Sequence, residues 1–163
     1  MLVGWYNKNM VIFEYKVAPA WLCPNIDTKT FYIRITDDAE GNVKTFFFGK
    51  KNTYTLSNDD IDKVKAIIRA RPDLFSINEL EPNAVLDGDE YSFVFSDGER
   101  IKRFKGYNIL DYGRKPRKNA TLALRIARII KDQVLLRNHI RTLIPNRLQH
   151  WPRYRKSSSL INI

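Results

Sequence analysis

The chain has 163 residues, of which 44% are hydrophobic and 28% are charged, and its formal net charge is +10. This length supports one buried core without disulfides or a metal ion, and the lone Cys23 excludes an intramolecular disulfide and a cysteine-based metal cluster. No apolar run approaches the roughly 18 residues of a membrane span. We expect a cytoplasmic protein with one domain over residues 1–144 and a basic tail over residues 145–163.

The N-terminal region predicts two β-hairpins. Residues 2–6 and 11–17 flank a turn that contains asparagine, a residue that tolerates the left-handed conformations of tight turns. Residues 31–36 alternate in polarity, and a loop with Gly41 joins them to a second apolar run at residues 43–48. Each pair of segments is expected to form two antiparallel strands.

A helix is predicted to begin after Ser57 and to end near Arg71. The Ser57 hydroxyl can accept a hydrogen bond from a free amide of the first turn, and Pro72 disfavours helical geometry in the residue before it. The apolar residues of this helix share one stripe, which consists of Ile61, Val64, Ile67 and Ile68. Residues 73–86 are expected to form an irregular link.

The clearest structural signal is a third hairpin within residues 87–108. Tyr91, Phe93 and Phe95 alternate with other side chains, as in a strand with one buried face. Asp97-Gly98 is typical of a tight turn in which glycine adopts a positive φ. The residues after this turn are expected to return as the second strand.

A long second helix is predicted from Asn119, whose side chain is expected to cap it. Its apolar stripe consists of Leu122, Ile126, Ile129, Ile130, Leu136 and Ile140. Together these elements predict an α+β fold with an antiparallel sheet of about four to six strands in hairpin order. Two helices are expected on one face of the sheet, followed by a basic C-terminal extension.

The order strand, loop, strand, loop, helix occurs twice, over residues 31–68 and 91–130. A twofold ββα pseudo-repeat would explain this order. Sequence identity between the two segments is slight, so a chance succession of two hairpins, each followed by a helix, stays open.

The third hairpin and the residues after it carry a resemblance. The residues concerned are, in order, Asp87-Gly88, Tyr91, Asp97-Gly98, Gly106-Tyr107-Asn108 and Pro116. Over about residues 30–132 this pattern resembles an uncharacterised family of small bacterial proteins that is common in Firmicutes. The resemblance implies a bacterial protein of this fold, and it implies no activity because none is assigned to that family.

The residues that usually carry catalysis are few. The chain has two histidines, His139 and His150, and one cysteine, and its carboxylates are concentrated in predicted turns and at a helix start. No HExxH, GxSxG or CxxC motif and no phosphate-binding glycine loop occurs. We therefore expect a protein without enzymatic activity and without a cofactor.

Nearly all the excess positive charge lies in the C-terminal third. Residues 101–163 contain 16 Lys or Arg and 2 Asp or Glu, whereas residues 1–100 contain 12 and 16. Such cations can neutralise phosphates, and the aromatic rings among them can stack on bases. The candidate polyanion-binding residues are Arg114, Lys115, Arg117, Lys118, Arg125, Arg128, Arg137, Arg141, Trp151, Arg153, Tyr154 and Arg155.

These residues predict a non-enzymatic binding module that engages an acidic partner. RNA or single-stranded DNA is the named alternative, and an immunity or inhibitor protein is a further one. A solvated basic face without a partner stays open as well. A membrane surface is disfavoured, because the apolar stripe of the second helix is needed to cover the sheet.

Overall fold

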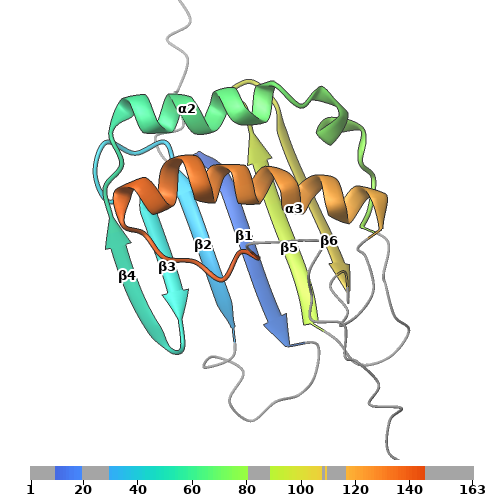
Figure 1. The fold of residues 1–163 in the computed structure, drawn as a ribbon, viewed down its shortest axis with the longest axis horizontal. Helices are drawn as coiled ribbons and strands as arrows, with labels where there is room; N and C mark the ends of the chain where they lie inside the picture. Colours follow the sequence, from blue (N-terminus) through green and yellow to red (C-terminus); the bar gives the residue numbers. More distant parts are fainter. Residues whose placement is uncertain (1–9, 20–29, 81–88, 108, 110–116, 146–163) are drawn as a thin grey trace, which may run out of the picture.

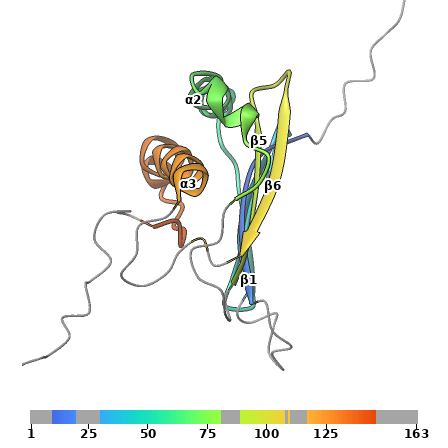
Figure 2. The same cartoon turned by 90° about the vertical axis from the view of Figure 1, so that its right-hand side faces the viewer.

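In the described part of the chain, one antiparallel sheet carries the helices α2 and α3 on the same face (Figure 1 and Figure 2). The computed structural model describes residues 10–19, 30–80, 89–107, 109 and 117–145. The strands hydrogen-bond in the order β4-β3-β2-β1-β5-β6, and they are β1 (Val11–Pro19), β2 (Phe31–Thr36), β3 (Val43–Phe47), β4 (Lys50–Tyr54), β5 (Asp89–Ser96) and β6 (Ile101–Tyr107). The helices are α2 (Asn58–Arg69) and α3 (Lys118–Ile130), and the short 3-10 helix η1 (Pro72–Ser76) follows α2. The predicted α+β class and hairpin order are confirmed.

The face of the sheet toward the helices carries the core. β1 contributes Phe13 and Tyr15, β5 contributes Phe93 and Phe95, and none of the four is more than 1% exposed. The rings of Phe93 and Phe95 are stacked with centroids 5.8 Å apart, and the Tyr15 ring lies 5.3 Å from that of Phe93. Full burial of one such apolar side chain stabilises the fold by about 1.5 to 3 kcal/mol, so the two central strands anchor the domain.

The second and third predicted hairpins are confirmed. β2 pairs with β3 through four residue pairs, from Tyr32 to Ile35 on the β2 side. β5 pairs with β6 over the whole length from Glu90 to Ser96. Gly98, in the turn between β5 and β6, has a φ of 98°, as the Asp-Gly pair predicts.

The start of α2 follows its sequence. Ser57 is the N-cap residue, and its hydroxyl oxygen accepts a hydrogen bond of 3.1 Å from the backbone N–H of Asp60. The helix ends at Arg69, shortly before Pro72, as predicted. Its buried residues are Ile61, Val64 and Ile68.

The stripe predicted for α3 is confirmed in part, since Ile126, Ile130 and, beyond the helix, Ile140 are buried. Leu122 and Ile129 are only half-buried, and Leu136 beyond the helix is 46% exposed. The buried face is rich in alanine, which a stripe drawn through the large apolar residues overlooks. It consists of Ala120, Ala123, Leu124, Ile126, Ala127 and Ile130. Alanine side chains fit where α3 lies beside α2, and the larger residues at positions 122 and 129 are partly exposed.

The predicted cap of α3 is wrong. Arg117 occupies the N-cap in an extended conformation, and it makes no side-chain capping hydrogen bond. Asn119 is the second residue of α3, and its side-chain amide donates a hydrogen bond of 3.3 Å to the backbone carbonyl of Glu79. Asn119 therefore ties the start of α3 to the segment after η1 rather than capping the helix.

The prediction for the first strands also needs correction. The neighbours of β1 in the sheet are β2 along one edge and β5 along the other, both of them later in the chain. Residues 2–6 themselves lie outside the described part of the chain. The prediction missed β4, whose sequence KKNTY is polar and which pairs with β3 at the edge of the sheet. The first of the two predicted ββα units therefore contains an extra strand, and the pseudo-repeat stays a prediction.

Beyond α3 the helical path continues as a π turn (η2, Lys131–Leu135) and a 3-10 turn (η3, Leu136–Asn138). His139 then adopts a left-handed conformation with a φ of 59°, and Ile140 and Ile144 are buried. Lys131 is 2% exposed, and its Nζ donates a hydrogen bond of 2.8 Å to the carbonyl of Ile144. Burial, together with the charge of Arg128, lowers the pKa of Lys131 by more than Asp132 raises it.

No helix in the described part of the chain is long and apolar enough to span a membrane. Of the predicted basic tail, residues 146–163 lie outside the described residues.

Candidate functional site

The face of the sheet opposite the helices carries two rows of side chains that cross all six strands. Figure 2 shows α2 and α3 on one side of the sheet only. The strand registers place one row along Lys51, Phe46, Tyr32, Lys16, Ser92 and Lys105. They place the neighbouring row along Thr53, Lys44, Arg34, Glu14, Val94 and Arg103. We call these two rows the open face.

Two aromatic rings form a stacked pair within the open face. Tyr32 on β2 and Phe46 on β3 are register partners, and their ring centroids are 5.6 Å apart with an interplanar angle of 14°. Both side chains are half-buried. The guanidinium carbon of Arg34 lies 5.5 Å from the centroid of the Tyr32 ring, within range of a cation–π interaction. The pair thus places two nearly parallel, half-buried aromatic rings on the side of the sheet away from the helices.

Cations outnumber acids on the open face. Arg34 pairs with Glu14, and Lys105 pairs with Glu90 of the same face at 3.3 Å. The remaining cations form no ion pair with any described residue. They are Lys16, Lys44, Lys51 and Arg103. Lys16 and Lys51 are the register neighbours of the Tyr32–Phe46 pair on either side, and Lys44 lies on the same strand as Phe46. Arg103 lies farther away, on β6.

The structure locates six of the twelve residues predicted from the basic C-terminal third. Arg117, Lys118, Arg125, Arg137 and Arg141 are exposed, and Arg128 is half-buried. The other six lie outside the described residues: Arg114, Lys115, Trp151, Arg153, Tyr154 and Arg155. Lys118, Arg125 and Arg128 lie on α3, which covers the opposite side of the sheet from the open face.

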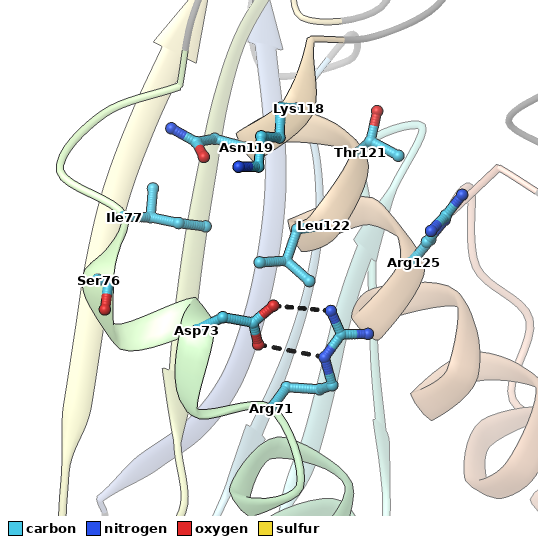
Figure 3. Close-up of a pocket in the computed structure, with 9 residues that line it drawn as sticks. All are labelled: Arg71, Asp73, Ser76, Ile77, Lys118, Asn119, Thr121, Leu122 and Arg125. Carbon is cyan, nitrogen blue, oxygen red and sulfur yellow. Dashed lines mark hydrogen bonds and ion pairs between the residues drawn. The ribbon is translucent and has the colours of Figure 1, made fainter.

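Lys118 and Arg125 contribute to a pocket of about 550 Å³ between η1 and α3 (Figure 3). Arg71 also lines this pocket, but its guanidinium donates hydrogen bonds of 3.2 and 2.8 Å to both carboxylate oxygens of Asp73. The hydrogen bond from Arg71 lowers the pKa of Asp73, which keeps the carboxylate charged and the pair neutral. Figure 3 shows the Arg125 side chain directed away from this pair. The pocket therefore concentrates less positive charge than its three cations imply.

Metal chemistry finds no support in the described part of the chain, where no group of three or more His, Cys, Asp or Glu side chains is placed to hold an ion. His139 is exposed at the end of η3, and His150 and Cys23 lie outside the described residues. The structure instead assembles the open face, whose residues need not gain or lose a proton to make contacts.

Sequence reasoning missed the open face because its residues are dispersed. They come from six separate strands of the first 107 residues, which contain 15 Lys or Arg and 16 Asp or Glu and so show no excess of positive charge. A signal was nevertheless present in the strands, since the outward positions of residues 31–36 are Tyr32 and Arg34 and those of residues 43–47 include Lys44 and Phe46. A search of the polar side of each predicted strand for Lys, Arg and aromatic residues would have found it.

Comparison with family models, with curated proteins and with solved structures gives no match to this chain. A function must therefore be argued from the geometry of the chain itself.

Proposed function

We propose that this protein binds single-stranded nucleic acid, RNA or DNA, on the open face of its sheet. The observation that carries the proposal is the half-buried Tyr32–Phe46 pair on the side of the sheet away from the helices, with cations on the strands around it that form no ion pair with any described residue. Aromatic side chains on an uncovered sheet bind bases by stacking, and each stacked base contributes about 1 to 3 kcal/mol. The surrounding lysines and arginine would neutralise the phosphates that link the stacked bases.

A single strand fits this surface better than a duplex. The bases of a duplex are stacked on one another, so they cannot lie on Tyr32 or Phe46 without being extruded. A flat six-stranded face is also far wider than the two-stranded ribbon that the major groove admits. Stacking with backbone neutralisation is tolerant of sequence, because every base has a π-face.

An acidic protein partner is the second candidate, because the same cations would attract carboxylates. The aromatic pair favours nucleic acid over this partner, since stacked rings offer bases a surface that carboxylate side chains do not use. Neither binding function requires a catalytic group, and we keep the proposal of a non-enzymatic protein in the cytoplasm. The immunity or inhibitor role and the relation to the Firmicutes family stay predictions with no further support.

The central experiment measures binding of fluorescent single strands of about 16 nucleotides at low salt. The double variant Tyr32→Ala, Phe46→Ala should bind about tenfold more weakly or worse, because two stacking surfaces are lost. Matched duplex DNA and polyglutamate serve as competitors. Displacement by polyglutamate as effective as by RNA, together with unchanged affinity in the double variant, would replace nucleic acid by an acidic protein partner.

A charge-reversal pair tests which side of the sheet binds. Reversal of Lys44, Lys51 and Arg103 to Glu should weaken binding and make the salt dependence shallower by about 2 in the slope of log K against log salt. The matched control reverses Lys118, Arg125 and Arg137, which lie on the helix side, and should leave both quantities nearly unchanged. Loss of binding in the control alone would overturn the open face and restore the basic C-terminal third as the binding surface.

A further inference from the structure

The pocket between η1 and α3 contains an arginine that is held in a fixed orientation. Arg71 donates hydrogen bonds from its Nε and from one terminal nitrogen to the two carboxylate oxygens of Asp73. This pairing uses one edge of the planar guanidinium, so its second terminal nitrogen points away from Asp73 (Figure 3). That nitrogen forms no hydrogen bond with any described residue. Asp73 therefore orients Arg71 and leaves N–H donors available to a ligand in the pocket.

Two further cations line the same pocket from α3. Lys118 and Arg125 form no ion pair with any described residue. They lie on one side of the helix, about two turns and roughly 10 Å apart along its axis. Asp73 is the one acid among the described residues that line the pocket, so this lining has a net positive charge. The pocket therefore favours an anionic ligand over a cationic one.

Apolar side chains lie between these charged groups. Ile77, at the end of η1, is 3% exposed, and the half-buried Leu122 of α3 packs against the core. Figure 3 shows Leu122 between Lys118 and the Arg71–Asp73 pair. The volume of about 550 Å³ is typical of small-molecule sites, which combine an apolar wall with a few polar groups. An inorganic anion would leave this apolar wall unused.

We infer that the pocket between η1 and α3 binds a small organic anion with an aromatic or other apolar body. The anionic group accepts hydrogen bonds from Arg71, and the body lies on Leu122 and Ile77. Lys118 and Arg125 add electrostatic attraction from α3. Asp73 is a positioning residue, because it orients Arg71 without contacting the ligand. This site lies on the helix side of the sheet, so it is independent of nucleic-acid binding on the open face.

The test measures binding of 8-anilinonaphthalene-1-sulfonate to the full chain by fluorescence, because this probe joins an aromatic body to one anionic group. The wild type should bind it saturably, and N-phenyl-1-naphthylamine, which lacks the sulfonate, should bind about tenfold more weakly or worse. Arg71→Lys keeps the charge and loses the planar donor edge, so it should weaken sulfonate binding about fivefold or more. Arg141→Lys makes the same change at an exposed position beyond η3 and should bind like the wild type.

Asp73→Asn separates an oriented site from attraction by charge alone. The substitution removes the one negative charge of the described lining, so charge alone predicts tighter binding of the sulfonate. Asparagine can accept only one of the two hydrogen bonds that fix Arg71, so the inference predicts binding that is about threefold weaker or worse. Tighter or unchanged binding by Asp73→Asn would overturn it.

The remaining outcomes separate this pocket from the open face. Tyr32→Ala, Phe46→Ala should bind the sulfonate like the wild type, and a loss in that variant would overturn the inference by placing the probe on the open face. Equal losses in Arg71→Lys and Arg141→Lys, or no saturable binding by the wild type, would overturn it as well. Saturable sulfonate binding that depends on Arg71, in a protein that binds no single strand, would support the inference and overturn the proposed function.

Discussion

Arg100 holds the carboxylate of Asp97 from one side while its guanidinium lies over an aromatic ring. Its Nε and a terminal nitrogen donate hydrogen bonds of 3.0 and 2.9 Å to one oxygen of Asp97, and its carbon Cζ lies 4.0 Å from the centroid of the Phe75 ring. The other oxygen accepts from the backbone N–H groups of Glu99 and Arg100 at 3.0 and 2.7 Å. Arg69 of α2 donates to the Asp97 carbonyl at 2.7 Å. One turn thereby joins β5 and β6 to α2 and η1.

Asp97→Asn should destabilise the fold by roughly 1 to 3 kcal/mol, because the amide cannot accept the same set of charge-assisted hydrogen bonds. Burial alone raises the pKa of Asp97, but the hydrogen bonds from Arg100 and Glu99 outweigh it and lower the pKa below its ordinary value. The stability gained from the carboxylate is therefore present above the unfolded pKa of about 3.9, and it is lost as the pH falls through the lower pKa of the folded state.

Urea denaturation at a series of pH values checks this prediction. The difference in unfolding free energy between wild type and Asp97→Asn should be constant near neutral pH and should shrink below about pH 4. Asp73→Asn is the control, because Asp73 is exposed and its pair with Arg71 is worth little. A difference that does not change down to pH 2 would contradict the assigned role of the carboxylate.

Two glycine substitutions should destabilise the fold for different reasons. Gly98→Val should cost roughly 1 to 3 kcal/mol through backbone strain, since φ is 98° and a new Cβ would make only ordinary contact with Lys65 at 3.5 Å. Gly106→Ala should also destabilise, because its Cβ would lie 2.5 Å from the Cβ of Leu80 and 2.8 Å from a methyl carbon of Ile109. Thermal melts of both variants measure the two losses, and the double variant Leu80→Ala, Gly106→Ala should show no rescue, because alanine at position 80 keeps the Cβ that the new side chain meets.

Phe48→Asn, in the turn between β3 and β4, should raise the unfolding free energy by about 1 kcal/mol, because φ at this position is 48° and asparagine adopts positive φ more readily than phenylalanine. For a chain of this size that corresponds to a rise of about 2 to 4 °C in Tm. Calorimetry on the wild type and the variant measures it directly. A lower Tm would show that the contact of Phe48 with Phe47 outweighs the strain of the turn.

Lys131→Met should flatten the dependence of stability on alkaline pH. Because burial lowers the pKa of Lys131 in the folded state, the unfolded chain binds more protons as the pH approaches about 10.4, and stability rises with pH in that window. Methionine has a similar length and no charge, so the variant should be as stable as the wild type or more so at pH 7. Denaturation is measured between pH 7 and about 9.5, which stays below the pKa of about 10 of unfolded tyrosines. Over this range the unfolding free energy should rise more steeply with pH in the wild type than in the variant.

Local chemistry made much of the fold predictable. The Ser57 cap, the break at Pro72 and the Asp97-Gly98 turn depend on residues within a few positions of one another, and the structure has all three. The central place of β1 was not predictable in this way, because its pairing with β5 joins segments such as Phe13 and Phe95 that lie far apart in sequence. The pairing also decides which residues share the open face.

The part of the α3 stripe that was wrong has a different physical cause. A stripe inferred from Leu122 and Ile129 assumes that the largest apolar residues are the most buried. Ala123 and Ala127 are buried instead, because small side chains fit where α3 lies beside α2. The candidate site was hidden for the same kind of reason, since the Tyr32–Phe46 contact exists only after β2 and β3 pair.

Residues needed for folding and residues proposed for binding alternate along the same strands, because they lie on opposite faces of the sheet. In β2, Ile33 and Ile35 are buried beneath the helices while Tyr32 and Arg34 face outward. A mutational scan that reads abundance should therefore show sensitivity at every second position of this strand. A scan that measures ligand binding should show sensitivity at the positions between them as well. Dividing the binding of each variant by its abundance would therefore identify the residues that contact the ligand across the sheet.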